Sequence, residues 1–126
     1  MGIKNDWMES QIEAIGQGLA AILFGKEKLK KVFKKFEEKH QESESQKMDD
    51  MLLDVLMGQY LKSGEFLKAE ETLFSFIEKN HTQHMLMKAL SFYNQLLSLD
   101  EEKLNSSGFS KGKIQQSIEK LKQIYE

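Results

Sequence analysis

The sequence contains no cysteine, no proline and no arginine among its 126 residues. The absence of cysteine excludes disulfide bonds and thiolate metal ligands, and it is compatible with a reducing compartment. The absence of proline, together with many Leu, Lys, Glu, Gln, Met and Ala residues, favours an all-helical chain. The absence of arginine removes the planar side chain that proteins favour for bidentate contacts with phosphate or guanine. Because the net charge is only -2, we expect no nucleic-acid partner.

Motifs of catalysis and cofactor binding are missing as well. No serine lies in a nucleophile motif, and no glycine-rich phosphate loop is present. Residues 16–21 (GQGLAA) superficially fit a dinucleotide-binding pattern, but no strand precedes them and they fall within a helical register. Small residues there instead allow another helix to pack closely. We therefore expect a single domain that is not an enzyme and carries no cofactor.

No targeting segment is evident. The apolar run at residues 12–24 is interrupted by Glu13 and Gln17 and is too short to span a bilayer. Asp6 and Glu9 lie where a signal peptide would be basic. We expect a cytoplasmic protein.

Residues 7–40 carry one apolar stripe at spacings of three and four, which predicts helix. Its members are Met8, Ile12, Ile15, Leu19, Ile22, Leu29, Phe33 and Phe36. Gly25 interrupts the stripe without changing its register. Either Gly25 is a hinge between two helices, or the segment is one helix of about 50 Å that would favour a dimer. We favour the hinge, because glycine costs about 1 kcal/mol inside a helix.

Residues 41–48 are polar and predict a linker, which is either a loop or a frayed helix end, after which Asp49 or Asp50 is placed to cap a helix. Residues 49–80 then predict two helices that meet at Gly64. The inward residues expected on this pair are Leu52, Leu53, Val55, Leu56 and Tyr60 on the first helix, and Ala69, Leu73, Phe76 and Ile77 on the second.

Residues 82–125 predict a second pair of helices, with Thr82 and Ser110 as the N-terminal caps. A short helical turn is expected between them at residues 101–104. The buried stripe of the last helix is expected to consist of Ile114, Ile118, Leu121 and Tyr125.

Residues 52–76 resemble a tetratricopeptide repeat. The matching positions are Leu53, Leu56 and Tyr60 on the first helix, Gly64 at the turn, and Phe66 and Ala69 on the second helix. Met57 and Phe76 depart from the pattern by replacing small residues, and one repeat period further on the match is loose.

Nearly the whole chain also resembles a family of small uncharacterised bacterial proteins with tetratricopeptide-like helices. The resemblance is carried by residues 6–13, 23–26, 97–102 and 108–110 together with the repeat-like pair. It implies a helical fold and no known activity.

Three spacings that include a histidine fit metal sites. Glu37 with His40 and Glu78 with His81 have the spacing of carboxylate-bridged di-iron proteins, and His81 with His84 could hold a metal at a helix start. Both Glu–His pairs lie at polar helix ends, and no third ligand accompanies the two histidines. We therefore interpret these spacings as chance in a Glu-rich chain, and a metal-binding protein is the less favoured alternative.

Residues 26–39 form a basic amphipathic stretch with seven Lys and three Glu. Such a helix can lie on an anionic membrane surface, in which case Lys28, Lys31, Lys35 and Lys39 are the candidate contacts. The alternative is an ordinary domain helix whose lysines face water and whose phenylalanines belong to the core.

The expected architecture is thus an N-terminal long helix or helical hairpin packed on tetratricopeptide-like antiparallel helix pairs. The leading functional hypothesis is a non-catalytic scaffold that binds an unknown protein or peptide. By analogy with the repeat fold, its candidate contact residues are Asp54, Gly58, Leu61 and Lys62. Trp7, near an open helix end, is a further candidate, and a place in the core is the more common role for such a residue. Because one repeat does not bury its own faces, a second copy of the chain is a further expected partner.

Overall fold

The computed structural model describes residues 18–38 and 43–126. These residues form seven helices and no strand, so the all-α class is confirmed. The helices are α2 (Leu19–Phe24), α3 (Lys26–Glu38), α4 (Glu44–Lys62), α5 (Phe66–Lys79), α6 (Gln83–Leu97), α7 (Glu101–Ser106) and α8 (Lys111–Ile124).

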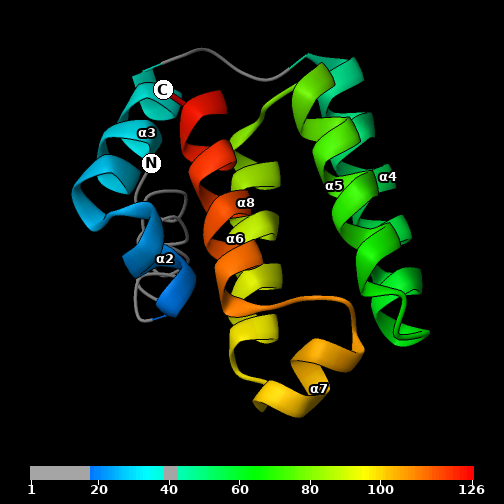
Figure 1. Cartoon of the computed structure of the whole chain (residues 1–126). Helices are drawn as coiled ribbons and strands as arrows, with labels where there is room; N and C mark the ends of the chain where they lie inside the picture. Colours follow the sequence, from blue (N-terminus) through cyan, green and yellow to red (C-terminus); the bar gives the residue numbers. More distant parts are fainter. Residues whose placement is uncertain (1–17, 39–42) are drawn as a thin grey trace.

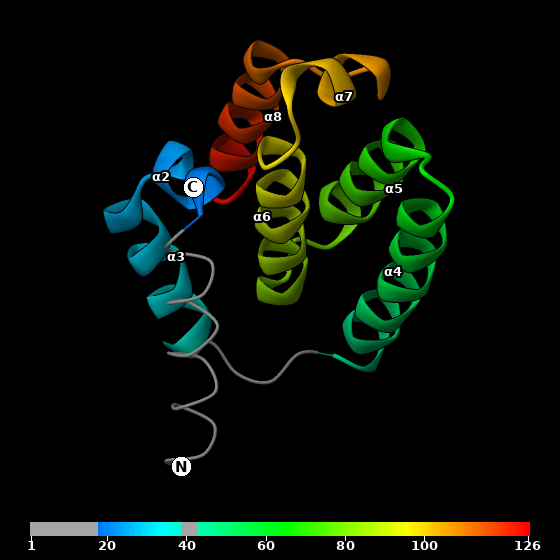
Figure 2. The ribbon, with the colours of Figure 1, turned by 90° about the horizontal axis from the view of Figure 1, so that it is seen from below.

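Helix α6 is the centre of the molecule. It contacts α2, α4, α5 and α8, and Figures 1 and 2 show α2 and α3 on one side of it with α4 and α5 on the other. Its residues with an exposed fraction of at most 2 % are Met85, Leu86, Ala89, Leu90, Phe92, Tyr93 and Leu96. Apolar residues therefore surround much of this helix, as is usual for a helix packed on several sides.

Gly25 separates α2 from α3 and confirms the expected hinge. Its φ angle is 104°, a value that residues with a Cβ rarely adopt. After the hinge the expected stripe is buried, with Leu29 and Phe33 both 2 % exposed. Before the hinge the expectation is wrong, because Leu19 and Ile22 are 56 % and 54 % exposed and the side of α2 that carries Ala20, Ala21 and Phe24 is buried instead. The expectations for residues 7–17 and 39–40 lie outside the described residues.

A close contact between Gly18 and Asn94 fixes the start of α2 on α6. Asn94 Oδ1 accepts a hydrogen bond of 2.8 Å from the backbone N–H of Ala20. A Cβ added to Gly18 would lie only 2.1 Å from Nδ2 of the same asparagine. The small residue thus permits a side chain of α6 to satisfy a helix-start amide that has no partner within its own helix.

We expect Gly18→Ala and Asn94→Ala each to lower the free energy of unfolding by about 1–3 kcal/mol, because each removes the hydrogen bond to Ala20. The double variant should lose about as much as either single variant, since the bond can be lost only once. Urea denaturation of the four proteins measures this cycle. Strictly additive losses would show that the two residues act independently.

Helix α4 begins earlier than the sequence suggested. Ser43 Oγ accepts from the Gln46 N–H at 3.1 Å, and Gln46 Oε1 accepts from the Ser43 N–H at 3.0 Å, which is a complete capping box. The expectation that residues 41–48 form a linker is therefore wrong from Glu44 onward, and so is a cap at Asp49 or Asp50. The polar first turn of α4 carries no apolar stripe, so periodicity alone could not reveal it.

Thr82 joins three elements through its side chain and its backbone carbonyl. It caps α6 as expected, accepting from the Met85 N–H at 3.1 Å, and it donates a bond of 2.7 Å to Asp50 Oδ1 on α4. Its carbonyl oxygen accepts a bond of 2.6 Å from the Tyr125 hydroxyl, just after α8. Thr82 and Asp50 are the buried polar residues of the described chain, at 2 % and 8 % exposed, so this junction is held by paired polar groups.

A second polar junction ties α5, α6 and α8 together. Glu70 Oε2 accepts bonds from the Tyr93 hydroxyl at 2.6 Å and from the Ser117 hydroxyl at 2.8 Å. Burial, with the charge of Glu70, raises the pKa of the Tyr93 phenol, which therefore stays protonated as a donor.

The C-terminal helix follows the sequence prediction closely. Ser110 Oγ caps α8 by accepting from the Lys113 N–H at 3.1 Å. The four residues of the expected stripe are all buried, with exposed fractions between 0 % and 5 %. The expected helical turn at residues 101–104 is present within α7.

Candidate functional site

The candidate contact residues on α4 differ in how far they are buried. Asp54 is engaged within the chain, because its carboxylate lies 2.8 and 2.9 Å from His84 Nε2 and 3.2 Å from Lys88 Nζ on α6. Leu61 is half-buried and packs against the core, whereas Gly58 and Lys62 are exposed. The fifth candidate, Trp7, lies outside the described residues.

The outward side of α4 carries a strip of large apolar side chains, which we call the outer stripe. It consists of Met48, Met51, Leu52 and Val55, which are 67 %, 69 %, 50 % and 56 % exposed. At about 100° per residue these four positions lie within one arc of about 100° on the helix. Figure 2 shows α4 at the edge of the molecule, with α5 and α6 on its inner side.

The outer stripe corrects part of the sequence interpretation. Leu52 and Val55 were expected to point inward, but Leu53 and Met57, both 0 % exposed, occupy the side that packs on the core. Apolar residues line both sides of α4, so the sequence pattern could not decide which side would be buried. One signal in the sequence could have revealed the outer stripe. Its four residues share one side of the helix, and polar residues lie at both ends of that side.

Two charged residues, one at each end, and a glycine complete the outward side of α4. Glu44 lies in the first turn of α4 and Lys62 in the last, both exposed. Neither forms a salt bridge within the part of the chain that the structure describes. A Cβ added to Gly58 would meet no atom within 4 Å. The outward side of α4 is therefore acidic at one end, apolar in the middle, open to solvent beside Gly58 and basic at the other end.

The basic stretch forms α3, and its apolar side belongs to the core. Leu29, Val32 and Phe33 are at most 4 % exposed. Lys28 donates a hydrogen bond to the Glu126 carboxylate and forms an ion pair with it. This hydrogen bond and the positive charge of Lys28 lower the pKa of the Glu126 carboxyl. The other candidate lysines on the helix, Lys31 and Lys35, are exposed, and Lys39 lies outside the described residues. The lysine side alone is thus available to a surface in this conformation.

Across residues 18–38 and 43–126, every helix falls short of the length and hydropathy needed to cross a membrane.

The histidine spacings do not converge on a shared point. His84 bonds Asp54, the His81 ring packs edge-on against Tyr125 at 5.7 Å between centroids, and Glu78 pairs with Lys120 at 3.3 Å. Within the described residues, no group of three His, Asp or Glu side chains is arranged to hold a metal ion. Glu37 belongs to α3, but its proposed partner His40 lies outside the described residues.

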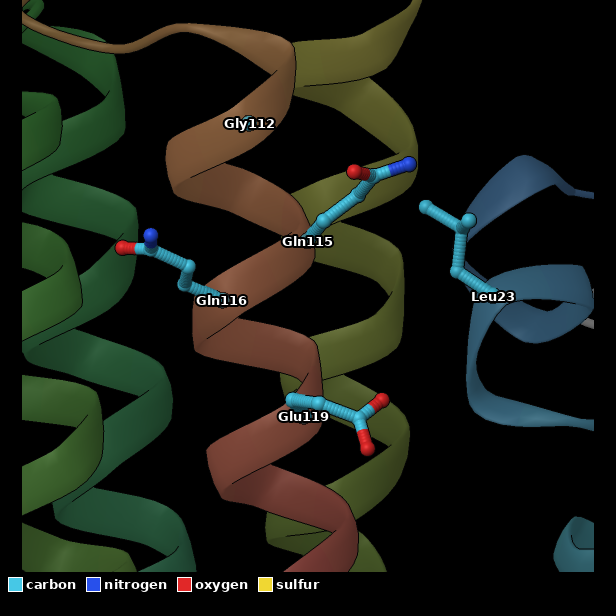
Figure 3. Close-up of a pocket in the computed structure, with 5 residues that line it drawn as sticks. All are labelled: Leu23, Gly112, Gln115, Gln116 and Glu119. Atoms are coloured by element: carbon cyan, nitrogen blue, oxygen red, sulfur yellow. The ribbon is translucent and has the colours of Figure 1, made fainter.

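A depression of about 490 Å³ lies between α2 and α8 (Figure 3). Leu23 reaches from α2 toward Gln115 and Glu119 on α8, while Gln116 points to the other side of α8. Leu23 is the one apolar side chain of the lining, and the four lining residues on α8 are exposed. Ligand sites are usually enclosed and mostly apolar, so the depression is a weaker candidate than the outer stripe.

Comparison with known proteins places the chain in a family. A family model described as "Family of unknown function (DUF6483)" matches residues 2–126. The chain belongs to this family. No curated protein and no solved structure matches it. Membership in DUF6483 agrees with the resemblance to an uncharacterised family and assigns no activity to any residue.

Proposed function

We propose that this protein is a non-catalytic protein–protein interaction module, and that its docking surface is the outward side of α4. The observation that carries the proposal is the outer stripe. Scattered exposed apolar residues are common on proteins, but a contiguous apolar strip with a polar rim is typical of an interaction surface. Two of its four members are methionines, whose flexible side chains adapt to a partner's surface.

The α4–α5 pair also supports a tetratricopeptide-like unit as part of this function. Gly64 supplies the turn with a φ angle of 76°, and Ala69 is 0 % exposed, as expected for a small residue at a close helix crossing. In repeats of this kind the first helix of a pair lines the binding surface. By that analogy α4 would be the binding helix, with Gly58 and Lys62 among its contacts.

The alternative function, binding of α3 to an anionic membrane surface, has less support. Apolar insertion and charge attraction together give amphipathic helices their membrane affinity. Since Leu29, Val32 and Phe33 are buried, α3 would have to bind by charge alone, through the exposed lysines at positions 26, 30, 31, 34 and 35. Attraction by charge alone is salt-sensitive, and the exposed Glu27, Glu37 and Glu38 on the same helix oppose it.

A photo-reactive amino acid placed at Val55 tests the interaction function in cells of the source organism. We expect ultraviolet light to give adducts of discrete mass from this position. The matched control is the same amino acid at Ile22, an apolar position on α2 with nearly the same exposed fraction, 54 % against 56 %. Adducts that form equally from both positions, or from neither, would contradict a docking surface on α4.

A further inference from the structure

We infer that the outward side of α4 pairs with the same side of a second copy of this chain, with the two helices antiparallel. This inference rests on the proposed function and names the partner. A twofold interface brings one surface patch against itself, so the patch must be self-complementary. The following features show that this patch is.

The first feature is the spacing of the residues. Positions 44, 48, 51, 55, 58 and 62 follow one another at intervals of four and three along α4. This alternation keeps a seam on one side of a helix, and it is the spacing by which two helices pack side chains into each other's gaps. Leu52 lies beside the seam and widens its apolar part.

The second feature is the charge at the two ends of the seam. It begins with the carboxylate of Glu44 and ends with the ammonium group of Lys62, and neither has an ion-pair partner among residues 18–38 and 43–126. An antiparallel partner places each Glu44 beside the Lys62 of the second copy, so two opposite-charge pairs form. A parallel partner would place like charges together at both ends, which is unfavourable. Charge therefore selects the antiparallel orientation.

The third feature is the fit in that same register. When Glu44 of one copy lies opposite Lys62 of the other, the antiparallel register is set, and the numbers of any two facing residues sum to 106. Met48 then lies opposite Gly58, and Met51 lies opposite Val55. The space beside Gly58, where a Cβ meets nothing within 4 Å, can receive the long side chain of Met48. One register thus satisfies the charges, the gap and the apolar middle together.

The size of the surface indicates a weak and concentration-dependent dimer. The seam runs the 19 residues of α4, or about 28 Å. A single pair of helices of this length lies at the small end of specific interfaces, about 1,200 Å², for which we expect dissociation constants on the order of 1–100 µM. Sedimentation of the purified full chain should show a shift from the 14.6 kDa mass to twice that mass as concentration rises.

Charge reversal provides the decisive test. We expect Glu44→Lys and Lys62→Glu each to raise the dissociation constant about tenfold, and the double variant to return to within about threefold of the original value. Within one chain the double variant is the least favourable of the three, because it opposes the helix dipole at both ends. Recovery of dimerisation in the double variant therefore reports pairing between copies. A double variant weaker than both single variants would overturn the inference.

Engineered cysteines test the orientation independently, since the natural chain has none. Mixing the Glu44→Cys and Lys62→Cys variants under mild oxidation should give the mixed disulfide, with little Glu44→Cys homodimer. Predominant Glu44→Cys homodimer would contradict the antiparallel arrangement. A matched pair of variants tests the seam: Val55→Glu should weaken dimerisation at least about tenfold, and Ile22→Glu should leave it unchanged.

The two proposals fail in different ways. A purified chain that keeps the 14.6 kDa mass up to about 1 mM, together with an adduct of a different protein at Val55, would reject the second copy and retain the interaction function. Absence of both dimer and adduct would reject both. An adduct of twice the chain mass at Val55 supports both.

Discussion

Replacing Phe24 with alanine is expected to lower the free energy of unfolding by about 3–5 kcal/mol. Phe24 is the last residue of α2 and is 0 % exposed, and α2 packs against α6 and α8. Removal of the ring leaves a cavity between the N-terminal hairpin and the central helix, in addition to the lost burial of apolar surface. Because a domain of this size is stable by only about 5–15 kcal/mol, the loss would be a large part of the total. Urea denaturation followed by circular dichroism measures it.

Ile22→Ala is the matched control for this prediction. Ile22 lies on the same short helix, two residues earlier, and is 54 % exposed. Its truncation should cost no more than about 1 kcal/mol, because little buried surface is removed. Similar losses in the two variants would mean that α2 does not pack on α6 through Phe24.

Replacing Thr82 with valine is expected to lower the free energy of unfolding by about 2–4 kcal/mol. The substitution keeps the shape of the side chain and removes its hydroxyl, so α6 loses its cap, which costs about 1 kcal/mol. The same change leaves the Asp50 carboxylate, 8 % exposed, without the donor that lies 2.7 Å away, and an unsatisfied buried group costs about 1–3 kcal/mol more. Thermal or urea unfolding gives the comparison.

Thr82→Ser separates the hydroxyl from the methyl group. Serine can keep both the cap on the Met85 N–H and the bond to Asp50, so we expect it to lose less than about half of what valine loses. The Tyr125 bond goes to the backbone carbonyl of residue 82 and is retained in both variants. A serine variant as unstable as the valine variant would show that packing of the methyl group, and not the hydrogen bonds, holds this junction.

Variants on the surface of α4 and variants in the core should differ in their effect on stability. A destabilised core and a disrupted surface would both reduce binding in cells, so the two must be told apart. Val55→Glu alters a residue that is more than half exposed, and we expect the monomer to unfold at nearly the same denaturant concentration as the original chain. Phe24→Ala and Thr82→Val should instead lower the denaturant concentration at which the monomer unfolds and leave the outward side of α4 unchanged. These variants distinguish loss of the surface from loss of the fold.

The sequence by itself determined the class and most of the helices. The lack of proline and the spacing of apolar residues indicated an all-helical chain, and Gly25 and Gly64 marked a hinge and a turn. The sequence also predicted the caps at Thr82 and Ser110, because a cap depends on hydrogen bonds between residues close in the sequence. It predicted the buried stripe of α8, because only one side of that helix is apolar.

Tertiary structure decided what periodicity could not. The start of α4 at Glu44 depends on a capping box in a polar stretch, and the contact of Asn94 with Gly18 joins residues 74 or more positions apart along the chain. Periodicity also could not predict which side of α4 is buried. This helix has apolar residues on two sides, and the burial of Leu53 and Met57 against α5 and α6 leaves Met48, Met51, Leu52 and Val55 facing outward. A helix that is apolar on two sides can pack through only one of them on a given core, so only the packed structure shows which side stays exposed.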